Sequence, residues 1–569
     1  MGDPHYRTFD GRLFDFMGTC TYVIAKHCGK DRNLPAFEVL AQNENRGSLG
    51  VSYVGLVMVK VYNVTITVVR SERGRVRIDN SLWSLPIVLN NSKLNLFQCG
   101  RSAVIESDFG LTVRYDWDHN LVVTLSNTFA GKTCGLCGNF NGIPTDDFTT
   151  PTGTQESGVV AFGSSWKVPG FGDEPNCRDD CVGGCDSCNS HLMTKYGHDL
   201  FCGLITKEKG PFTSCHPVID PQAYLENCKY DLCMGGGLQQ FLCKTLETYT
   251  QACQDAGIQV QDWRKMAKCF AKCPANSHYE LCGNACPATC SDPTAPSKCK
   301  RPCVETCTCD NGFVLSGDEC VPAVKCGCTY EGHYVPAGEA FWADQSCKRW
   351  CKCIPGSRRV ECQDKGCGAG QQCKVVNGIR NCQAVSYSTC HATGDPHYVT
   401  FDKVRFDFQG TCVYQLAALC SKDPELVPFE VLVQNDRGSK VVSYTKLVQI
   451  KVYSTSIVIT QTHKGLIMVN DELVNLPVNL KDGKIYVYKS GWDAVVTTDF
   501  GLKVSFNWKS AAFVTLPSNY KGAVCGLCGN YNDKPQDDLI PKDGNKPAKP
   551  TDFGSSWRVA EIPGCVVLE

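Results

Sequence analysis

Two short Asp-Pro-His clusters carry the residue types needed to break a peptide bond without a second molecule. They are Asp3, Pro4 and His5, and Asp395, Pro396 and His397. An Asp side chain can attack its own backbone carbonyl, which forms a cyclic anhydride and expels the proline nitrogen, and a nearby His can assist the proton transfer. Strain in a tight turn favours this reaction because twisting the amide removes its resonance. The alternative interpretation of each cluster is a plain Asp-Pro turn.

Closely spaced Asn and Asp side chains form a second chemical pattern. In the stretch CGNFNGIPTDDF, Asn139, Asn141, Asp146 and Asp147 fall within nine residues on a glycine-containing loop. Ca²⁺ takes six to eight oxygen ligands and suits such a loop, although the spacing differs from that of an EF-hand. The alternative is an Asx-rich loop exposed to solvent.

Both patterns lie in a domain that occurs twice. GDPHYRTFDGRLFDF recurs as GDPHYVTFDKVRFDF, CGLCGNFNG as CGLCGNYND, and FGSSWKV as FGSSWRV. Between these motifs, runs such as LVMVKVYNVTITVV alternate apolar and polar residues and are rich in Val and Thr, which indicates strands. The glycine in SDFGL and TDFGL predicts a turn or bulge between strands. We expect each copy to be a β-sandwich.

Cysteine content points to an oxidising, extracellular compartment. The 569 residues include 40 cysteines and only 11 histidines, which favours disulfides over a set of zinc sites. The formal net charge of −1 gives no indication of nucleic-acid binding. No stretch has the apolar length of a signal peptide or a membrane span, so we expect an internal piece of a longer secreted chain. Asn63 and Asn90 begin candidate N-glycosylation sequons.

The segment between the two copies is divided into small modules. Residues 188–269 contain eight cysteines and helix-like segments such as PQAYLENCKYDLC and LQQFLCKTLETYTQAC, and residues 273–326 contain ten cysteines and few apolar residues. A segment of the second kind must be stabilised by disulfides because it cannot build a core. The predicted domains are 2–176, 177–270, 271–326, 327–389 and 390–569.

The ordered set of motifs resembles the von Willebrand factor type D assembly of gel-forming mucins and related extracellular matrix proteins. FDFMGTCTY and PAFEVLAQNENRGS are most similar to the branch of the family that binds the Fc part of IgG, with the zonadhesin and alpha-tectorin branches nearer than the mucins. The resemblance implies a mainly β chain with two type D β-sandwich domains. Between them it implies a helical eight-cysteine module, a trypsin-inhibitor-like module and a short cysteine-rich module. It also implies a secreted component of mucus or matrix. The implied partners are mucins or other matrix glycoproteins, IgG Fc, and neighbouring D assemblies of the same longer chain.

The resemblance also assigns roles to individual residues. Asp-Pro-His sites in similar domains are associated with autocatalytic cleavage, and an anhydride left on Asp395 could be captured by water or by another molecule. One Ca²⁺ per type D domain is implied. The first ligand set is Asp10, Asn139, Asn141, the carbonyl of Ile143, Asp146 and Asp147, and the second is Asp402, Asn530, Asn532, Asp537 and Asp538. Asp533 replaces a glycine in the second loop, where the backbone is therefore less free to adopt a positive φ.

Disulfide pairings follow from the same resemblance. The implied pairs are Cys20–Cys177, Cys28–Cys134, Cys390–Cys528, Cys412–Cys565 and Cys420–Cys525. Cys137 and Cys99 are then left without partners, so either they pair with each other or they are free. Multimer-forming relatives carry Cys-x-Cys in the eight-cysteine module, but Phe241 stands two residues before Cys243, which puts that interchain bond in doubt.

Three other functions compete with the structural one. The Cys-Gly-Leu-Cys motifs at Cys134 and Cys525 resemble thiol-oxidoreductase sites but lack the following helix that lowers a thiol pKa. Residues 299–303 correspond to the reactive loop of similar protease inhibitors, although Pro302 after Arg301 fits serine proteases poorly. The sequence has no GxSxG, HExxH or phosphate-binding motif. We therefore expect no enzymatic turnover beyond self-cleavage.

Overall fold

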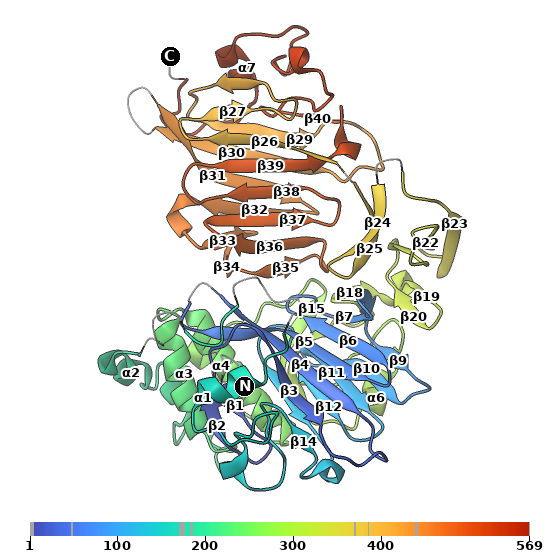
Figure 1. Cartoon of the computed structure of the whole chain (residues 1–569), viewed down its shortest axis with the longest axis vertical. Helices are drawn as coiled ribbons and strands as arrows, with labels where there is room; N and C mark the ends of the chain where they lie inside the picture. Colours follow the sequence, from blue (N-terminus) through green and yellow to red (C-terminus); the bar gives the residue numbers. More distant parts are fainter. Residues whose placement is uncertain are drawn as a thin grey trace. The chain divides into compact units, whose positions relative to one another are not determined.

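The computed structural model describes residues 5–46, 49–169, 177–181, 185, 187–368, 371–384, 386–437 and 442–567. Figure 1 shows the chain coloured along its sequence. It divides into two compact units, the first made of Met1–Ala340 and Cys351–Cys362, the second of Phe341–Trp350 and Gln363–Glu569. Each unit contains one copy of the repeated domain.

The first copy is a β-sandwich, as its alternating sequence predicts. One sheet has the order β14 (Thr133–Cys134), β3 (Thr21–His27), β4 (Phe37–Asn45), β5 (Ser52–Val61), β6 (Val64–Val69), β7 (Arg75–Ile78), β8 (Ser81–Ser84). The other has the order β13 (Leu121–Thr124), β12 (Thr112–Tyr115), β11 (Ser102–Ser107), β10 (Leu94–Cys99), β9 (Ile87–Leu89). Inward side chains of both sheets, such as Val59 and Ile105, form one buried cluster. A separate hairpin consists of β1 (His5–Arg7) and β2 (Leu13–Asp15). The helices of this copy are η1 (Asn127–Phe129), η2 (Pro144–Asp146) and α1 (Val159–Ser165).

The turns between strands follow from local residue types. Tyr62 and Asn63 connect β5 to β6 with positive φ angles of 49° and 59°, the conformation of a two-residue hairpin turn that matches the twist of the strands. Gly110, with φ of 87°, lies in the turn between β11 and β12, which confirms the turn predicted from SDFGL.

The second copy repeats the sandwich with two strands that have no counterpart among the named strands in the described part of the first copy, β26 (Tyr387–Thr393) and β41 (Arg558–Ala560). Its first sheet has the order β34 (Glu472–Asn475), β33 (Leu466–Val469), β32 (Thr455–Thr460), β31 (Ser443–Val452), β30 (Phe429–Arg437), β29 (Val413–Leu419), β40 (Val524–Cys525), and β41 (Arg558–Ala560) also pairs with β29. The second has the order β28 (Arg405–Asp407), β27 (His397–Val399), β26 (Tyr387–Thr393), β39 (Ala512–Pro517), β38 (Lys503–Phe506), β37 (Asp493–Thr498), β36 (Ile485–Ser490), β35 (Val478–Leu480). Its helices are η5 (Gln461–His463), η6 (Ser518–Tyr520), η7 (Pro535–Asp537) and α7 (Pro550–Ser556). Strand β26 therefore connects the Asp-Pro-His hairpin to the sandwich, an arrangement that the described part of the first copy does not have.

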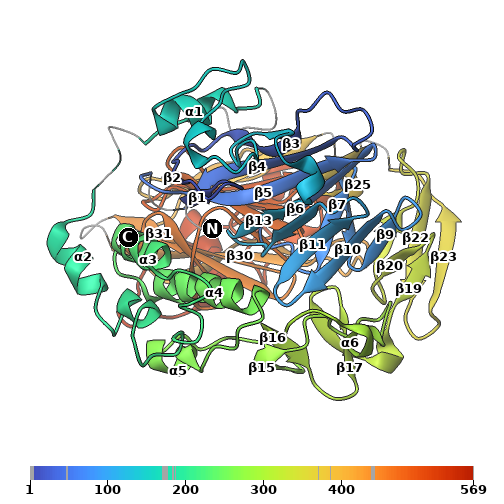
Figure 2. The same cartoon turned by 90° about the horizontal axis from the view of Figure 1, so that it is seen from below.

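The eight-cysteine module is helical, and the two helix-like segments of the sequence form its longest helices. They are α3 (Gln222–Met234) and α4 (Gln239–Asp255), accompanied by α2 (Ser190–Tyr196), η3 (Cys202–Ile205) and α5 (Trp263–Ala267). Four disulfides, Cys188–Cys233, Cys202–Cys228, Cys215–Cys253 and Cys243–Cys269, close the module on itself. Helix α4 lies against the first sandwich (Figure 2), where Arg114 of β12 forms an ion pair with Asp255.

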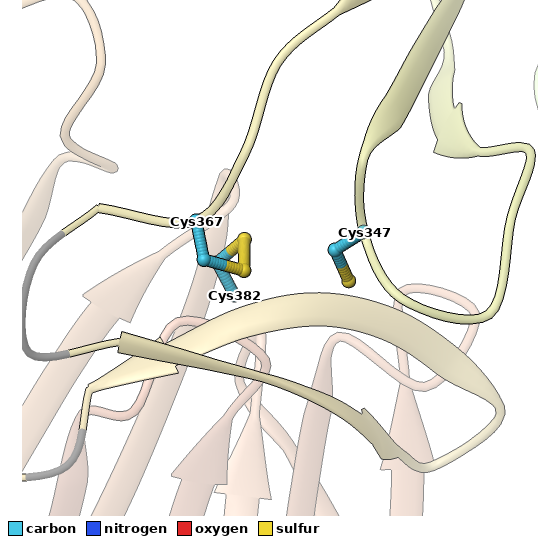
Figure 3. A group of neighbouring side chains, drawn as sticks. All are labelled: Cys347, Cys367 and Cys382. Atoms are coloured by element: carbon cyan, nitrogen blue, oxygen red, sulfur yellow. A yellow bond between two sulfur atoms is a disulfide. The ribbon is translucent and has the colours of Figure 1, made fainter.

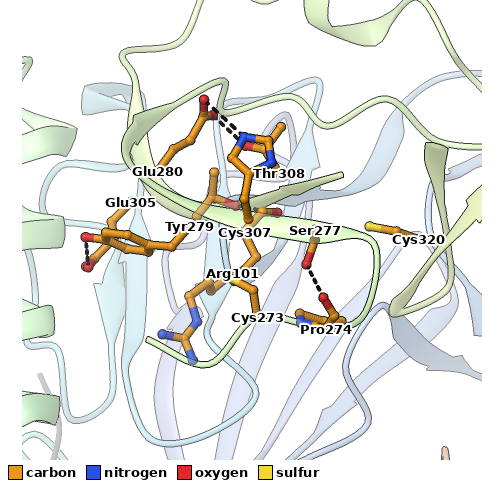
Figure 4. The surroundings of a disulfide bond; sticks show 12 residues. Arg101, Cys273, Pro274, Ser277, Tyr279, Glu280, Glu305, Cys307, Thr308 and Cys320 are labelled. Carbon is orange, nitrogen blue, oxygen red and sulfur yellow. Dashed lines mark hydrogen bonds and ion pairs between the residues drawn. A yellow bond between two sulfur atoms is a disulfide. The ribbon is translucent and has the colours of Figure 1, made fainter. Parts of the chain in front are cut away.

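The ten-cysteine module consists of short helices and strands held together by five internal disulfides. They are Cys273–Cys307, Cys282–Cys303, Cys286–Cys299, Cys290–Cys326 and Cys309–Cys320. Its elements are β15 (Ser277–Gly283), α6 (Ala295–Lys298), β16 (Val304–Cys309), β17 (Phe313–Ser316), β18 (Glu319–Pro322) and η4 (Ala323–Lys325). Around Cys273–Cys307, Tyr279 donates a hydrogen bond to Glu305 at 2.6 Å and Thr308 donates to Glu280 at 2.6 Å (Figure 4). Cross-links and polar pairs thus replace an apolar core here.

Short strands also make up the region that follows. They are β19 (Cys328–Tyr330), β20 (His333–Val335), β21 (Ala340–Trp342), β22 (Arg349–Ile354), β23 (Arg359–Asp364), β24 (Gln371–Val376) and β25 (Ile379–Ala384). The disulfides of this region are Cys328–Cys353, Cys347–Cys373, Cys351–Cys362 and Cys367–Cys382. The chain is mainly β with one helical module, which confirms the predicted fold class.

Candidate functional site

The second Asp-Pro-His cluster forms the loop of a tight β-hairpin. Thr393 of β26 pairs with His397 of β27, which leaves Gly394, Asp395 and Pro396 in the turn. Gly394 has φ of 66°, in the left-handed region that favours glycine. The Asp395 side chain is exposed and Pro396 is buried. The carboxyl group that would attack is therefore on the surface, while the ring of the leaving proline is packed in the domain.

His397 lies against this turn. Its Nδ1 is 2.7 Å from Oδ1 of Asp407, the residue opposite it on β28. A methyl group on Gly394 would lie 3.7 Å from Cδ2 of His397, which places the imidazole beside the loop. The side chain is 61% exposed. Asp407 thus orients the ring through one nitrogen and leaves the other available for proton transfer.

The carbonyl of the bond that would break has its own side-chain donor. Nε2 of Gln409 donates to the backbone oxygen of Asp395 at 3.0 Å. Neither Gln409 nor Asp407 was predicted from the sequence to take part in the site. A signal existed for Asp407, because each copy places an Asp ten residues after the His of the cluster. The contact of Gln409 depends on how the chain folds back after β28.

In the first copy, the His of the cluster has a different environment. Asp3 and Pro4 lie outside the described residues, and His5 begins β1. Nδ1 of His5 is 2.6 Å from Oδ1 of Asp15, and Nε2 is 3.1 Å from Oδ1 of Asp231, which belongs to helix α3 of the eight-cysteine module. His5 is only 4% exposed and Asp231 7%. Both ring nitrogens are therefore engaged by carboxylates.

This arrangement favours an imidazolium that stays charged near neutral pH. Burial lowers the pKa of His5, but the charge of Asp231 and the hydrogen bonds to Asp15 and Asp231 outweigh it and raise the pKa to about 10. A ring whose two protons are both held by carboxylates is a poor proton donor to a leaving group near neutral pH.

The first Asn/Asp loop is ordered by its own polar groups and by Asp10. Asp10 accepts from the backbone N–H groups of Asn141 at 3.0 Å and Gly142 at 2.8 Å. Asp146 accepts from the side-chain amides of Asn139 at 3.0 Å and Asn141 at 2.7 Å. The carbonyl of Ile143 accepts from Asp146 N–H at 3.4 Å. Every residue of the predicted first ligand set therefore lies in this loop or in direct contact with it.

The second loop repeats these contacts. Asp402 accepts from the N–H groups of Asn532 at 2.9 Å and Asp533 at 3.0 Å, and Asp537 accepts from the amides of Asn530 at 3.1 Å and Asn532 at 2.8 Å. Asp533 adopts φ of 63°, the strained position anticipated from the sequence. The side-chain oxygen of Asn530 is buried and has no hydrogen-bond partner among the described residues.

These donor sets suit a hard cation. Burial, together with the nearby charges of Asp10 and Asp402, raises the pKa values of Asp147 and Asp538 to about 6 against the hydrogen bonds from Thr8 and Thr400. No three acidic side chains in the described part of either loop converge within 4.8 Å, so a cation would need the amide and carbonyl oxygens as well. Carboxylate, amide and carbonyl oxygens are the ligands that Ca²⁺ accepts.

Three of the four cysteines in the two Cys-Gly-Leu-Cys motifs, Cys134, Cys525 and Cys528, are bonded to cysteines outside their own motif, and Cys137 is free. The structure joins all five pairs implied by the resemblance, Cys20–Cys177, Cys28–Cys134, Cys390–Cys528, Cys412–Cys565 and Cys420–Cys525. Because neither motif closes an internal disulfide, neither has the dithiol pair that a thiol oxidoreductase cycles.

The two leftover cysteines are thiols and do not pair with each other. Cys99 and Cys137 are free, and burial raises the pKa of both, that of Cys137 to about 12. A thiol with a raised pKa is a weak nucleophile because little thiolate forms. Cys347 also lies close to Cys367 and Cys382 (Figure 3), but all three belong to disulfides and offer no thiolate to a metal.

The loop that corresponds to an inhibitor's reactive loop packs against the first sandwich. Nη2 of Arg301 lies 3.0 Å from Oε1 of Glu106, and its guanidinium lies 4.8 Å from the centre of the Phe97 ring. Residues 298–301 line a cavity of about 550 Å³ with Leu85 and Phe97. Arg301 is therefore engaged by its own chain, which disfavours the protease-inhibitor alternative.

Both candidate glycosylation residues are exposed. Asn63 lies in the turn between β5 and β6, and Asn90 follows β9 with its side-chain amide 3.3 Å from the carbonyl of Tyr62. Their positions permit attachment of a sugar. No helix in the described part of the chain is long and apolar enough to cross a membrane.

Comparison with protein-family models identifies each module. The von Willebrand factor type D domain matches residues 1–154 and 390–545, the C8 domain 201–270, the trypsin-inhibitor-like cysteine-rich domain 273–326 and the TILa domain 327–383. Alignment over the full chain finds 47% identity to human IgGFc-binding protein and 38% to human zonadhesin. Human alpha-tectorin is 34% identical over 98% of the chain.

The relatives are much longer than this chain. It spans 10% of the IgGFc-binding protein, 20% of human zonadhesin and 26% of human alpha-tectorin. Its disulfides, its module order and these relatives place the chain among secreted, extracellular proteins.

Proposed function

The chain belongs to the von Willebrand factor type D domain family, and we propose that it is a calcium-stabilised scaffold of mucus or extracellular matrix that cleaves its own backbone at Asp395–Pro396. The broad structural and adhesive role is common to its relatives. Self-cleavage, calcium binding and particular partners are the specific parts of the proposal. Mucins, other matrix glycoproteins and IgG Fc are the partners to test, together with neighbouring D assemblies of the same longer chain. Asn63 and Asn90 are the proposed glycosylation sites.

The main support for self-cleavage is the position of the Asp395–Pro396 bond in the fold. Asp395–Pro396 lies in a three-residue hairpin loop, and the disulfide Cys390–Cys528 connects the strand before the loop to the domain that follows it. Strand β26 also pairs with β39 beyond the cut. Breaking this bond would therefore leave both fragments joined by a covalent bond and by a shared sheet. A matrix protein could open its backbone in this way without losing its connection.

The reaction uses only atoms of the hairpin and one water molecule. An oxygen of the Asp395 side chain forms a bond to the backbone carbonyl carbon of Asp395, and the bond from that carbon to the nitrogen of Pro396 breaks. The proline nitrogen takes one proton, with His397 as the candidate acid. Water then opens the cyclic anhydride to give a C-terminal Asp395. No turnover follows, because the chain is its own substrate.

Incubation of the purified chain at mildly acidic pH tests this function. We expect a reducing gel to separate two fragments, with N-terminal sequencing starting at Pro396, while a non-reducing gel shows one band. Asp395→Ala removes the attacking carboxyl and should abolish the cut. Three other Asp-Pro bonds, after Asp220, Asp292 and Asp423, are internal controls because no His follows their proline. Cleavage at all four bonds would indicate ordinary acid lability, and an intact wild-type chain would contradict the proposal.

A calcium role is supported by the two matching oxygen-rich loops. Asp10, Asn139, Asn141, Asp146, Asp147 and the Ile143 carbonyl would hold the first ion, and Asp402, Asn530, Asn532, Asp537 and Asp538 the second. A bound cation would link each loop to the segment that carries Asp10 or Asp402, which joins β1 to β2 in the first copy and β27 to β28 in the second.

A further inference from the structure

A preoriented amide faces the scissile carbonyl of the second copy. Gln409 Nε2 donates to the oxygen of Asp395 at 3.0 Å, and its Oε1 accepts the backbone N–H of Ser443 at 2.8 Å. Ser443 begins β31 and is fully buried. Because a backbone N–H can only donate, the amide oxygen must point to Ser443 and the NH₂ group to Asp395. The sandwich thus fixes which end of Gln409 meets the hairpin.

The direction of this hydrogen bond matches the charge that cleavage creates. When the Asp395 carboxylate adds to the backbone carbonyl carbon, the carbonyl oxygen becomes an oxyanion before the bond to Pro396 breaks. A donor already aimed at that oxygen stabilises the developing charge without reorganisation. The same contact in the ground state polarises the carbonyl toward attack.

The first copy has no amide side chain at the position equivalent to Gln409. Alignment of FDFMGTC with FDFQGTC places Met17 where the second copy has Gln409, and Ser52 where it has Ser443. A methionine thioether has no N–H to donate. Ser52 is completely buried and its Oγ has no hydrogen-bond partner among the described residues, whereas Oγ of Ser443 lies 3.4 Å from Oε1 of Gln409. The first copy therefore keeps the serine of this pair without its amide partner.

We propose that Gln409 is the oxyanion donor for self-cleavage at Asp395–Pro396, and that Met17 deprives the first Asp-Pro-His cluster of the same assistance. This inference rests on the proposed self-cleavage. It adds a catalytic residue, one that touches a reacting atom. It also makes the two clusters chemically unequal although their Asp-Pro-His residues are identical.

The test measures the rate at which the N-terminus of Pro396 appears in the full chain, by quantitative mass spectrometry after reduction. Gln409→Met copies the first cluster and should slow cleavage on the order of 10²-fold, the effect of removing one oxyanion donor. The control variant is Gln461→Met. Gln461 also donates to a backbone carbonyl, that of Lys509, at another exposed turn of the same domain, so its loss should leave the rate unchanged.

A second variant separates catalysis from a structural role. Gln409→Glu keeps an oxygen for the N–H of Ser443, but an ionised carboxylate cannot donate to Asp395. Its rate relative to wild type should be low near neutral pH and recover on acidification, as the carboxyl becomes a donor. The ratio cancels the titration of Asp395, His397 and Asp407, which both proteins share. A role limited to packing beside the turn, without a hydrogen bond to the Asp395 carbonyl, would give a ratio independent of pH.

The possible outcomes distinguish the donor role of Gln409 from self-cleavage itself. If wild type cleaves and Gln409→Met cleaves at the same rate, the oxyanion assignment is wrong while self-cleavage stands. The donor role is also overturned if Gln409→Met slows cleavage and lowers the melting temperature, while the rate of Gln409→Glu relative to wild type does not change with pH. A wild-type chain that never cleaves removes both the proposed function and this inference.

Discussion

The two hairpins that begin at the His of each Asp-Pro-His cluster, β1–β2 and β27–β28, have the same frame and different neighbours. In each, the Tyr after the His stacks on a Phe, with ring centres 5.1 Å apart for Tyr6–Phe14 and 5.0 Å for Tyr398–Phe406. Each of these Tyr hydroxyls also accepts from a buried Asn amide of the sandwich, at 2.8 Å and 3.0 Å. Around this frame, His5 is enclosed by two carboxylates, whereas His397 is exposed and contacts one. A repeated motif therefore fixes geometry, and its neighbours decide which chemistry the geometry can perform.

The largest expected difference between the hairpins is in stability. Asp231→Ala leaves the buried His5 imidazolium without its buried partner, which typically costs about 3–5 kcal/mol. The matched variant Asp407→Ala removes the exposed partner of His397 and should cost about 0–1 kcal/mol. Hydrogen exchange of peptides from α3 and from β1 would measure local opening in the first case. Equal, small effects of the two variants would mean that the contact between His5 and the C8 module contributes little.

Calcium should affect both copies alike, because their Asn/Asp loops make matching contacts although the hairpins beside them have different neighbours. A ligand present at 100 times its Kd stabilises the folded state by about 2.7 kcal/mol. We expect EDTA to lower the melting temperature of both type D domains, and calorimetric titration to show two ions. Asp147→Asn and Asp538→Asn should each remove one of them. Unchanged melting in EDTA together with no calcium uptake would contradict the assigned ligands.

The first hairpin should also respond to alkaline pH. The pKa of His5 is about 10 in the folded chain and ordinarily 6.5. A raised folded pKa contributes stability that is complete below the unfolded value and is lost as pH rises through the folded value. The free energy of unfolding should therefore fall between pH 7 and 10 by up to about 1.4 kcal/mol per pH unit. Asp231→Asn should flatten this slope, and the same steepness in that variant would assign the titration to another group.

Sequence patterns predicted the features that local residue order determines. The alternation of apolar and polar residues predicted the two sandwiches. Helices α3 and α4 were predicted from the segments PQAYLENCKYDLC and LQQFLCKTLETYTQAC. The spacing of Asn and Asp predicted two loops, and both fold as oxygen-rich clusters. The disulfide pairs came from family resemblance, because 40 cysteines allow far too many pairings for spacing to choose among them.

Contacts between distant segments could not be predicted in this way. The His5–Asp231 pair joins residues 226 positions apart and exists only because the C8 helices pack on the first sandwich. Gln409 differs from Met17 visibly in the sequence, but nothing in the sequence indicates that its amide meets the Asp395 carbonyl. The first cluster was expected to be reactive because its motif is intact. The two carboxylates around His5, and Met17 at the position of Gln409, argue against that expectation.

The most direct test of the account counts both new N-termini in one sample of the wild-type chain. Terminal labelling followed by mass spectrometry over a time course would quantify chains that begin at Pro4 and chains that begin at Pro396. We expect a large excess of chains that begin at Pro396, on the order of 10²-fold from the Gln409 donor alone, and the disappearance of these chains in Asp395→Ala. Equal rates at the two sites, or an excess of Pro4, would show that the neighbours of the hairpins do not control their chemistry.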